Sequence, residues 1–204
     1  DARGRPPDAL REAIPDASPR IVVLVHGLCL SEASWSRRER VDLGTRLHQE
    51  LGYTPIYVRY NSGRRISTNG QELSELLERL SSVWPTPVDS LVLVGHSMGG
   101  LVARSAGSYA DRAACAWREP LSHLICLGAP HHGTSLEQAG HAVTTAMQAC
   151  AYLEPLALGK LRSAGIQDLR FGNLHDEDWR SAGDESSRGD RRMPAPLLAG
   201  VSHC

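Results

Sequence analysis

The stretch from Leu91 to Gly100, LVLVGHSMGG, constrains the fold of this chain more than any other. Four apolar residues lead into a Gly-x-Ser-x-Gly pattern, and a helical pattern without proline follows as far as Tyr109. This sequence predicts a strand that turns sharply into a helix, with Ser97 at the point of the turn. Gly95 and Gly99 have no Cβ atom, so the strand and the helix can pass close together. The hydroxyl of Ser97 is therefore expected to be exposed.

The Gly-x-Ser-x-Gly pattern alone is a weak signal in a chain with 19 glycines. Its flanks make the prediction specific, because a flexible Gly-Ser loop would have neither an apolar strand before it nor an unbroken helix after it. We therefore interpret the pattern as a strand–turn–helix element rather than as a turn that merely contains a serine. In such an element the backbone N–H of Met98 begins the helix and faces the space beside Ser97.

The size and charge of the chain argue against two classes of function. Its 204 residues suffice for one domain with a buried core. Lysine and arginine together number 22 against 23 acidic residues, and the arginines are scattered, so we expect no nucleic-acid partner. The longest purely apolar run, Ile21–Val25, is far shorter than the roughly 20 residues of a membrane-spanning helix, so we also expect no transmembrane segment.

The cysteines favour a reducing compartment. Their number is odd and no two are close enough in sequence to form a metal-binding knuckle, so reduced thiols are the simplest interpretation. We therefore expect a cytoplasmic protein, with a secreted form containing one disulfide as the alternative. The sequence begins with Asp1 and has no secretory apolar segment, so we expect an excerpt of a longer protein or one from which a leader was removed. The cysteines are Cys29, Cys115, Cys126, Cys150 and Cys204.

Strand-like and helix-like patterns alternate after residue 19. Residues 1–19 contain four prolines and no sustained periodicity, which predicts a flexible leader. The alternation that follows, without a detectable repeat, predicts a parallel sheet covered by helices on both faces, which is a three-layer α/β/α sandwich. Strands are predicted at Ile21–Val25, Thr54–Tyr60, Leu91–Val94, Ser122–Leu127 and Pro196–Ser202.

Leucine spacing predicts the helices between the first strands. Leu43, Leu47 and Leu51 recur at four-residue intervals before Gly52, a typical helix terminator. A second helix carries the leucines between residues 73 and 80, and the prolines at 85 and 87 bring it to an end.

Residues 134–195, before the last predicted strand, form an excursion from the sheet and a possible lid or cap. An apolar helix face runs from Leu136 to Cys150 and is either a lid or acyl-binding wall over a site or an ordinary core helix. Residues 159–192 are polar and are expected to be irregular.

Three motifs give the chain a family resemblance. They are VVLVHGL at Val22–Leu28, LVLVGHSMGGLVAR at Leu91–Arg104 and LGAPHHGT at Leu127–Thr134. Together they resemble the α/β-hydrolase superfamily, and within it the bacterial triacylglycerol lipases and the PGAP1-like deacylases of glycosylphosphatidylinositol inositol. The resemblance covers residues 20–133 well and the last predicted strand loosely, and it implies an α/β-hydrolase core over residues 20–204.

The resemblance assigns roles to particular residues. Ser97 would be the nucleophile that forms an acyl-enzyme with a carboxylic ester, in particular a lipid ester. The backbone N–H groups of Leu28 and Met98 would form the oxyanion hole, which stabilises the negative charge that develops on the ester carbonyl. The side chain of Leu28 would help to form an apolar wall for the acyl chain. No cofactor is implied.

The histidines near these motifs are expected to be structural. His96 adjoins Ser97, but neighbouring residues on a sharp turn project in different directions, so His96 is not expected to be its base. His26 ends the first strand and is expected to hold the adjacent loop by a hydrogen bond. His131 and His132 alone make no metal-ligand set, so a structural turn without a metal site is the simpler interpretation.

The other two members of a Ser–His–Asp triad are not found in these motifs. In the family, the acid follows the strand that Pro196–Ser202 resembles and the histidine follows one strand more, so we expect both beyond Cys204, in a sheet truncated after its fifth strand. The alternative within the chain is His203 as the base. Its orienting carboxylate would be Asp168, Asp176 or Asp178.

The sequence as a whole predicts a serine hydrolase of carboxylic esters, in particular lipid esters, that needs no cofactor. Its partner would be a small-molecule ester or lipid, with transient contact to a lipid interface. The alternative is a catalytically incomplete hydrolase-fold module that binds a lipid, another ligand or another protein. The sequence makes no prediction of oligomeric state.

Overall fold

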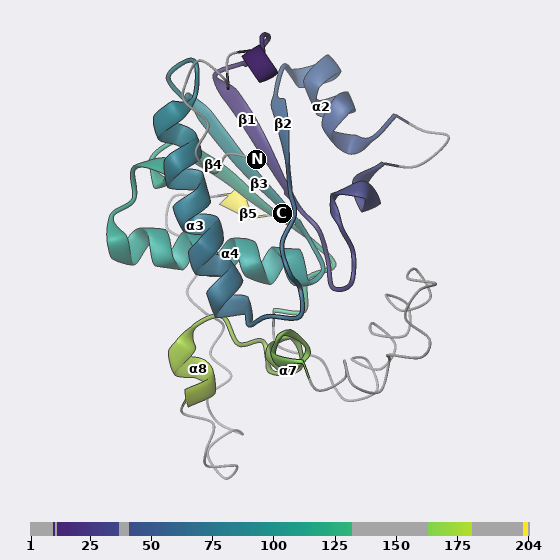
Figure 1. Ribbon diagram of the computed structural model, residues 1–204, viewed down its shortest axis with the longest axis vertical. Coiled ribbons are helices and arrows are strands. Elements are labelled where there is room, and N and C mark those ends of the chain that lie inside the picture. Colours follow the sequence, from purple (N-terminus) through teal and green to yellow (C-terminus); the bar gives the residue numbers. More distant parts are fainter. Residues whose placement is uncertain (1–9, 11, 37–40, 132–162, 181–201, 204) are drawn as a thin grey trace.

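The computed structural model describes residues 10, 12–36, 41–131, 163–180 and 202–203 (Figure 1). A sheet of parallel strands lies at its centre, and the strand order is β2-β1-β3-β4-β5. The strands are β1 (Arg20–Val25), β2 (Thr54–Val58), β3 (Ser90–His96), β4 (Leu121–Leu127) and β5 (Ser202–His203).

Helices cover both faces of this sheet. On one face, Leu43 and Leu47 of α2 (Leu43–Leu51) pack against the β1 side chains Val22 and Leu24. On the other face, α3 (Ile66–Val83) and α4 (Met98–Ala113) lie side by side (Figure 1). The predicted three-layer α/β/α architecture is therefore confirmed. Two short 3-10 helices complete this part of the chain, η1 (Glu32–Trp35) and η2 (Ala116–Arg118).

Successive strands are added on one side of β1 as far as β2, and on its other side from β3 onward. From β1 the chain moves outward to β2, then crosses back over β1 to β3 and continues to β4 on the other side. The loops after β1 and β3 therefore diverge at the carboxyl edge of the sheet, and open α/β sheets bind ligands at such a switch point. Leu28 follows β1 and Ser97 follows β3, so both lie at this point.

Side-chain caps and a left-handed glycine determine where α2 begins and ends. The Asp42 carboxylate accepts hydrogen bonds from the backbone N–H and the hydroxyl of Thr45. The Tyr57 hydroxyl donates to the same carboxylate, which ties α2 to β2. Burial would raise the pKa of Asp42, but these hydrogen bonds outweigh it and hold the pKa below its usual value. Gly52 ends the helix at a φ of 70°, as its position in the sequence predicted.

The next helix, α3, begins at Ile66, seven residues before the first leucine that predicted it. Arg65, the residue before the helix, makes no side-chain cap of its own. The missing cap comes from far along the chain, because the Asp168 carboxylate accepts the Ile66 N–H at 2.9 Å. A cap supplied over such a sequence separation leaves no local signal, so the leucine spacing predicts the helix but not the residue at which it begins.

Part of the predicted flexible leader packs against the core. Leu10 is buried, and the N–H of Ser18 donates to the Thr54 hydroxyl at 2.8 Å. The indole N–H of Trp84 donates to the Ser18 carbonyl at 2.9 Å. These bonds attach residues that precede β1 to the start of β2 and the end of α3.

The prediction that residues 159–192 are irregular is wrong for their described part. Two helices lie there, α7 (Ala164–Phe171) and α8 (Asp176–Arg180). The Ser163 hydroxyl caps α7 by accepting the Ile166 N–H, and the apolar side chains of Leu169 and Leu174 enter the core. Helices this short carry too few apolar repeats to be recognised from periodicity.

Two other predictions concern residues largely outside the described ranges. The helix face from Leu136 to Cys150 lies wholly outside them, and so does the predicted fifth strand except for Ser202. The described strand, β5, pairs with β4 in parallel, so that Ser202 lies opposite His123. In the part of the chain that the structure describes, no helix combines the length and apolarity needed to cross a membrane.

Candidate active site

Ser97 lies at a sharp turn between β3 and α4. Its φ of 51° and ψ of −121° lie outside the regions that residues with a side chain ordinarily adopt. Such a conformation costs about 1–3 kcal/mol and persists only where the surroundings enforce it. The Ser97 N–H donates to the Leu127 carbonyl at the end of β4 at 2.8 Å. This bond fixes the turn to the carboxyl edge of the sheet.

Two glycines make the turn sterically possible. A Cβ atom on Gly95 would lie 2.4 Å from the backbone of Gly100, where the strand passes under the first turn of the helix. A Cβ atom on Gly99 would lie 2.3 Å from the Val25 carbonyl oxygen and 2.5 Å from that of His26. Both positions therefore require glycine, and Gly99 presses the start of α4 against the end of β1.

The loop after β1 reaches the side chain of Ser97. A Cβ atom built on Gly27 would lie 3.3 Å from the Ser97 Cβ, so the two residues are neighbours. Leu28 follows Gly27, and Met98 opens α4, where the first N–H groups of a helix have no partner within the helix. The two residues predicted to supply the oxyanion hole thus lie on the two chain segments that adjoin Ser97.

A hydrogen bond to Gly27 orients the N–H of Leu28. The His26 imidazole donates through Nδ1 to the Gly27 carbonyl at 2.9 Å, and the Leu30 N–H donates to the same oxygen at 3.3 Å. That carbonyl belongs to the same peptide group as the Leu28 N–H, and the C=O and N–H of a trans peptide point in opposite directions. Holding the carbonyl on one side therefore directs the Leu28 N–H toward the other.

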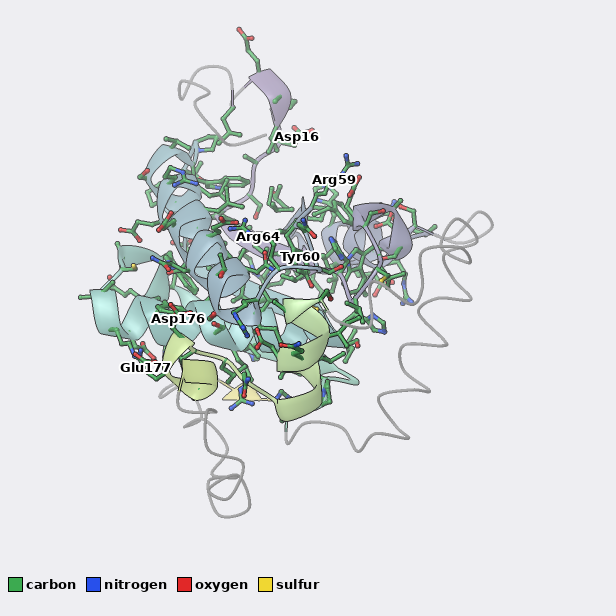
Figure 2. All side chains as sticks on the ribbon, turned by 60° about the horizontal axis from the view of Figure 1, so that its bottom comes forward. Asp16, Arg59, Tyr60, Arg64, Asp176 and Glu177 are labelled. Carbon is green, nitrogen blue, oxygen red and sulfur yellow. The ribbon has the colours of Figure 1, made fainter. Side chains whose placement is uncertain are left out.

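The ring of His26 is itself held by Tyr60, which Figure 2 shows in the loop between β2 and α3. The two rings stack with centroids 4.3 Å apart, and the Tyr60 N–H donates to His26 Nε2 at 3.4 Å. Burial lowers the pKa of His26, although its bond to Gly27 acts in the opposite sense. With both ring nitrogens engaged, His26 is a neutral structural residue, in keeping with its expected role in the loop.

The other histidines of the motifs make structural contacts. His96 is exposed and meets the Trp35 indole edge to face, with centroids 6.5 Å apart. His131 lies in the turn after β4 and accepts a hydrogen bond from Arg104 of α4 at 2.7 Å. Burial lowers the pKa of this arginine. Among the described residues, no three His, Cys, Asp or Glu side chains gather as metal ligands would, and His132 lies outside the described ranges.

His203, the predicted alternative base, lies away from the carboxyl edge. It pairs with Leu124 of β4, which in turn lies opposite Leu93 of β3. Leu93 precedes Ser97 by four residues, which in a strand is about 13 Å. The register therefore places the backbone of His203 level with the middle of β3 along the strand direction, below the turn that carries Ser97.

Two of the three carboxylates proposed as partners of His203 serve as helix caps. Asp168 is 1% exposed and is bound by the Arg65 guanidinium at 2.8 Å and by the Ile66 N–H. Burial raises the pKa of Asp168 despite these bonds. Asp178 accepts the N–H groups of Leu174 and His175 at 2.8 and 2.9 Å. Asp176 belongs to α8.

No sequence pattern predicted a second serine–histidine contact, which the structure shows. On α4, the Ser108 hydroxyl lies 2.7 Å from Nε2 of His175, and Nδ1 of His175 lies 3.7 Å from the Asp178 carboxylate. The order of groups resembles a triad, but Ser108 lies inside a regular helix, where backbone N–H groups are bonded within the helix. We interpret these contacts as the attachment of α8 to α4, which the bond from the Ser105 hydroxyl to the Leu174 carbonyl reinforces.

Comparison with known protein families shows to which family the chain belongs. A model described as "PGAP1-like alpha/beta domain" matches residues 16–155, which is more than half of the chain. The chain belongs to this family. The family match includes β1 to β4 and Ser97, and the suspected relationship to α/β hydrolases is confirmed. No curated protein sequence matches the chain at a significant level.

Solved structures agree with the family match at the level of fold. The lipase BlEst2 of Bacillus licheniformis in its mature form superposes with a TM-score of 0.54 at 20% identity, over 84% of this chain and 63% of that one. The propeptide form of BlEst2 gives a TM-score of 0.57 at 19% identity, over 93% of this chain and 35% of that one. The PGAP1-like chain thus spans less than two thirds of the length of either.

Proposed function

We propose that this PGAP1-like protein is a lipase- or esterase-type serine hydrolase that cleaves carboxylic esters, in particular lipid esters. The observation that carries the proposal is the strained turn at Ser97, with the N-terminus of α4 on one side and Gly27 on the other. A serine inside an ordinary helix or strand would not adopt this strained conformation. The fold and the lipase neighbours support the same assignment.

The geometry suggests how the residues would act. The Ser97 oxygen would attack the ester carbonyl carbon, and the negative charge on the carbonyl oxygen would be met by the N–H groups of Leu28 and Met98. Each such donor contributes about 3 kcal/mol of transition-state stabilisation. The alcohol then leaves with a proton, and water releases the acid from the acyl-enzyme. None of these steps requires a cofactor.

The preference for an apolar acyl group rests on Leu127 beside Ser97, because the side chain of Leu28, which was predicted to line the acyl site, is buried in the core. Leu127, whose carbonyl accepts the Ser97 N–H, is 40% exposed at the carboxyl edge of the sheet. An exposed leucine beside a reactive hydroxyl gives an acyl chain an apolar surface to contact. A small-molecule ester or a lipid at an interface would both present such a chain.

The proton of Ser97 must pass to a base. Among the described residues, no histidine paired with a carboxylate contacts Ser97, and the pair formed by His175 and Asp178 faces Ser108 instead. We propose that the base and its acid come from residues outside the described ranges. The same observation favours the second candidate, a hydrolase-fold module that binds a lipid or another ligand without cleaving it.

The test is hydrolysis of p-nitrophenyl butyrate by the purified protein and two serine variants. Ser97→Ala should lower kcat by about 10³-fold or more, whereas Ser108→Ala should stay within about twofold of the wild type. Unchanged turnover in Ser97→Ala would refute the assignment of the nucleophile. Wild-type protein that binds lipid vesicles without any turnover would support the binding module.

We also propose a cytoplasmic location. The described cysteines Cys115 and Cys126 are free thiols, which is typical of proteins in reducing compartments. A secreted, disulfide-bonded form would instead show a loss of titratable thiols in the native protein.

A further inference from the structure

The loop that carries the Leu28 N–H contains a strained residue. Cys29 has a φ of 57°, a left-handed conformation that a residue other than glycine adopts only where neighbouring groups enforce it. A loop in this state needs external contacts to keep its shape. The contacts that hold it show how the oxyanion donor is positioned.

Leu28 lies between two peptide groups, each held by a side chain. The first, between Gly27 and Leu28, is held by His26 through the Gly27 carbonyl. The second, between Leu28 and Cys29, is held by Ser62, whose hydroxyl oxygen accepts the Cys29 N–H at 3.0 Å. Because both flanking peptide groups are held, the rotations about the Leu28 Cα are restricted, and so is the direction of its N–H.

Ser62 belongs to the loop between β2 and α3, and this loop is firmly held in turn. In Figure 2 the labelled residues Tyr60 and Arg64 mark its course on either side of Ser62. The Asn61 side chain accepts the Gly63 N–H at 2.9 Å, and the Asn61 carbonyl accepts the Arg64 N–H at 3.1 Å. Ser62 therefore presents its hydroxyl from a turn that is closed by its own hydrogen bonds.

The helix α7 presses on the same loop from the outside. The Gly165 N–H donates to the Gly63 carbonyl at 3.3 Å. A Cβ atom on Gly165 would lie 2.3 Å from the Ser62 carbonyl oxygen, so the helix backbone touches the loop directly. Ser62 is thus fixed on one side by α7 and bonded on the other to the loop that contains Leu28.

We propose that Ser62 is a positioning residue for the oxyanion donor of Leu28, an inference that rests on the proposed hydrolase function. Ser62 does not touch the substrate. Its hydroxyl holds the Cys29 N–H and thereby keeps Cys29 in its strained conformation and restricts the direction of the Leu28 N–H. The role requires a hydroxyl acceptor at this position and nothing else of the side chain.

The test compares three variants of the full-length protein, including any residues that follow Cys204, in p-nitrophenyl butyrate hydrolysis and in amide hydrogen exchange. Ser62→Ala should lower kcat about 10-fold with KM within about twofold, because the donor is misaligned while the acyl contacts remain. Ser62→Thr keeps the hydroxyl and should restore most of kcat. Ser82→Ala is the control, since the Ser82 hydroxyl bonds within α3 on an exposed face. Exchange of the Cys29 amide should accelerate in Ser62→Ala alone.

The outcomes separate this inference from the proposed function. An active wild type with an equally active Ser62→Ala variant would overturn the positioning role and leave the hydrolase assignment intact. Loss of activity in both Ser62→Ala and Ser62→Thr, without faster exchange at Cys29, would overturn it as well. An inert wild type would refute the proposed function, and the positioning role would fall with it.

Discussion

Two serines, one just before α4 and one inside it, show what distinguishes a candidate nucleophile from a structural hydroxyl. Ser97 precedes the first turn of α4 in a strained conformation, beside the loop of Leu28, and no hydrogen bond joins its side chain to a histidine of the described residues. Ser108 lies inside α4 in hydrogen-bond distance of His175, with Asp178 nearby. The side-chain contacts alone would favour Ser108 as the nucleophile. The backbone favours Ser97, because N–H groups that can meet a developing negative charge lie beside that residue alone of the two.

The largest effect in this comparison is expected from the contact that places Ser97. Gly99→Ala would bring a Cβ atom to 2.3 Å from the Val25 carbonyl oxygen, so the start of α4 must move away from β1. A shift of this kind should lower kcat about 100-fold and destabilise the fold by about 1–3 kcal/mol. Ester hydrolysis and urea unfolding measure the two effects.

The matched control is Ala113→Gly, which makes the reverse exchange at the exposed end of the same helix. It should cost at most about 1 kcal/mol and leave kcat unchanged. If Gly99→Ala were as active as this control, the close approach of α4 to β1 would have no part in forming the site.

A smaller effect is expected at the second serine. His175→Ala removes a buried ring that bonds Ser108 and packs edge to face against Tyr109. The variant should unfold about 1–2 kcal/mol more easily in urea because α8 loses its attachment, while kcat should change less than about twofold. His123→Ala, an exposed histidine on β4, should change the free energy of unfolding by less than about 0.5 kcal/mol. A large fall in kcat for His175→Ala would show that Ser108, and not Ser97, is the reactive serine.

The smallest effect is expected on the pH dependence of stability, through Asp178 in the attachment of α8 to α4. Burial would raise the pKa of Asp178, but its bonds from His175 and the Leu174 N–H prevail and lower it. A carboxylate with a lowered pKa stabilises the fold above its unfolded pKa of about 4, and this contribution is lost as the pH falls through the folded value. Asp178→Asn should therefore lose less stability than the wild type between about pH 5 and pH 3. Urea unfolding measures the free energy of unfolding at both pH values. If the wild type and Asp178→Asn lost the same amount between them, Asp178 would not stabilise α8 electrostatically.

Local sequence signals predicted the sheet and the turn that carries Ser97. The apolar run Ile21–Val25, the Gly52 terminator and the Gly-x-Ser-x-Gly pattern each act within a few residues, so the sequence around them suffices. The remaining features depend on long-range contacts. Asp168 caps α3 across about a hundred residues, and the short helix α7 is held by contacts with a distant loop.

The residues of the candidate site also fall into those predicted by a local pattern and those positioned by long-range contacts. The positions of Ser97 and Met98 follow from the pattern in which they occur, whereas the parts that hold Leu28 do not. Tyr60 and Ser62 reach the loop after β1 from the loop after β2, more than thirty residues away. No spacing rule connects the two loops, because only the crossover of the chain in the sheet brings them together.

We propose that backbone geometry, and not contact with a histidine, selects the reactive serine. Treating the protein with a fluorophosphonate probe and mapping the adduct by peptide mass spectrometry tests this proposal, since the probe reacts with a serine whose site stabilises an oxyanion. We expect one adduct on the peptide that contains Ser97, its loss in Ser97→Ala, and its retention in Ser108→Ala. An adduct on Ser108, or labelling that persists in Ser97→Ala, would contradict it.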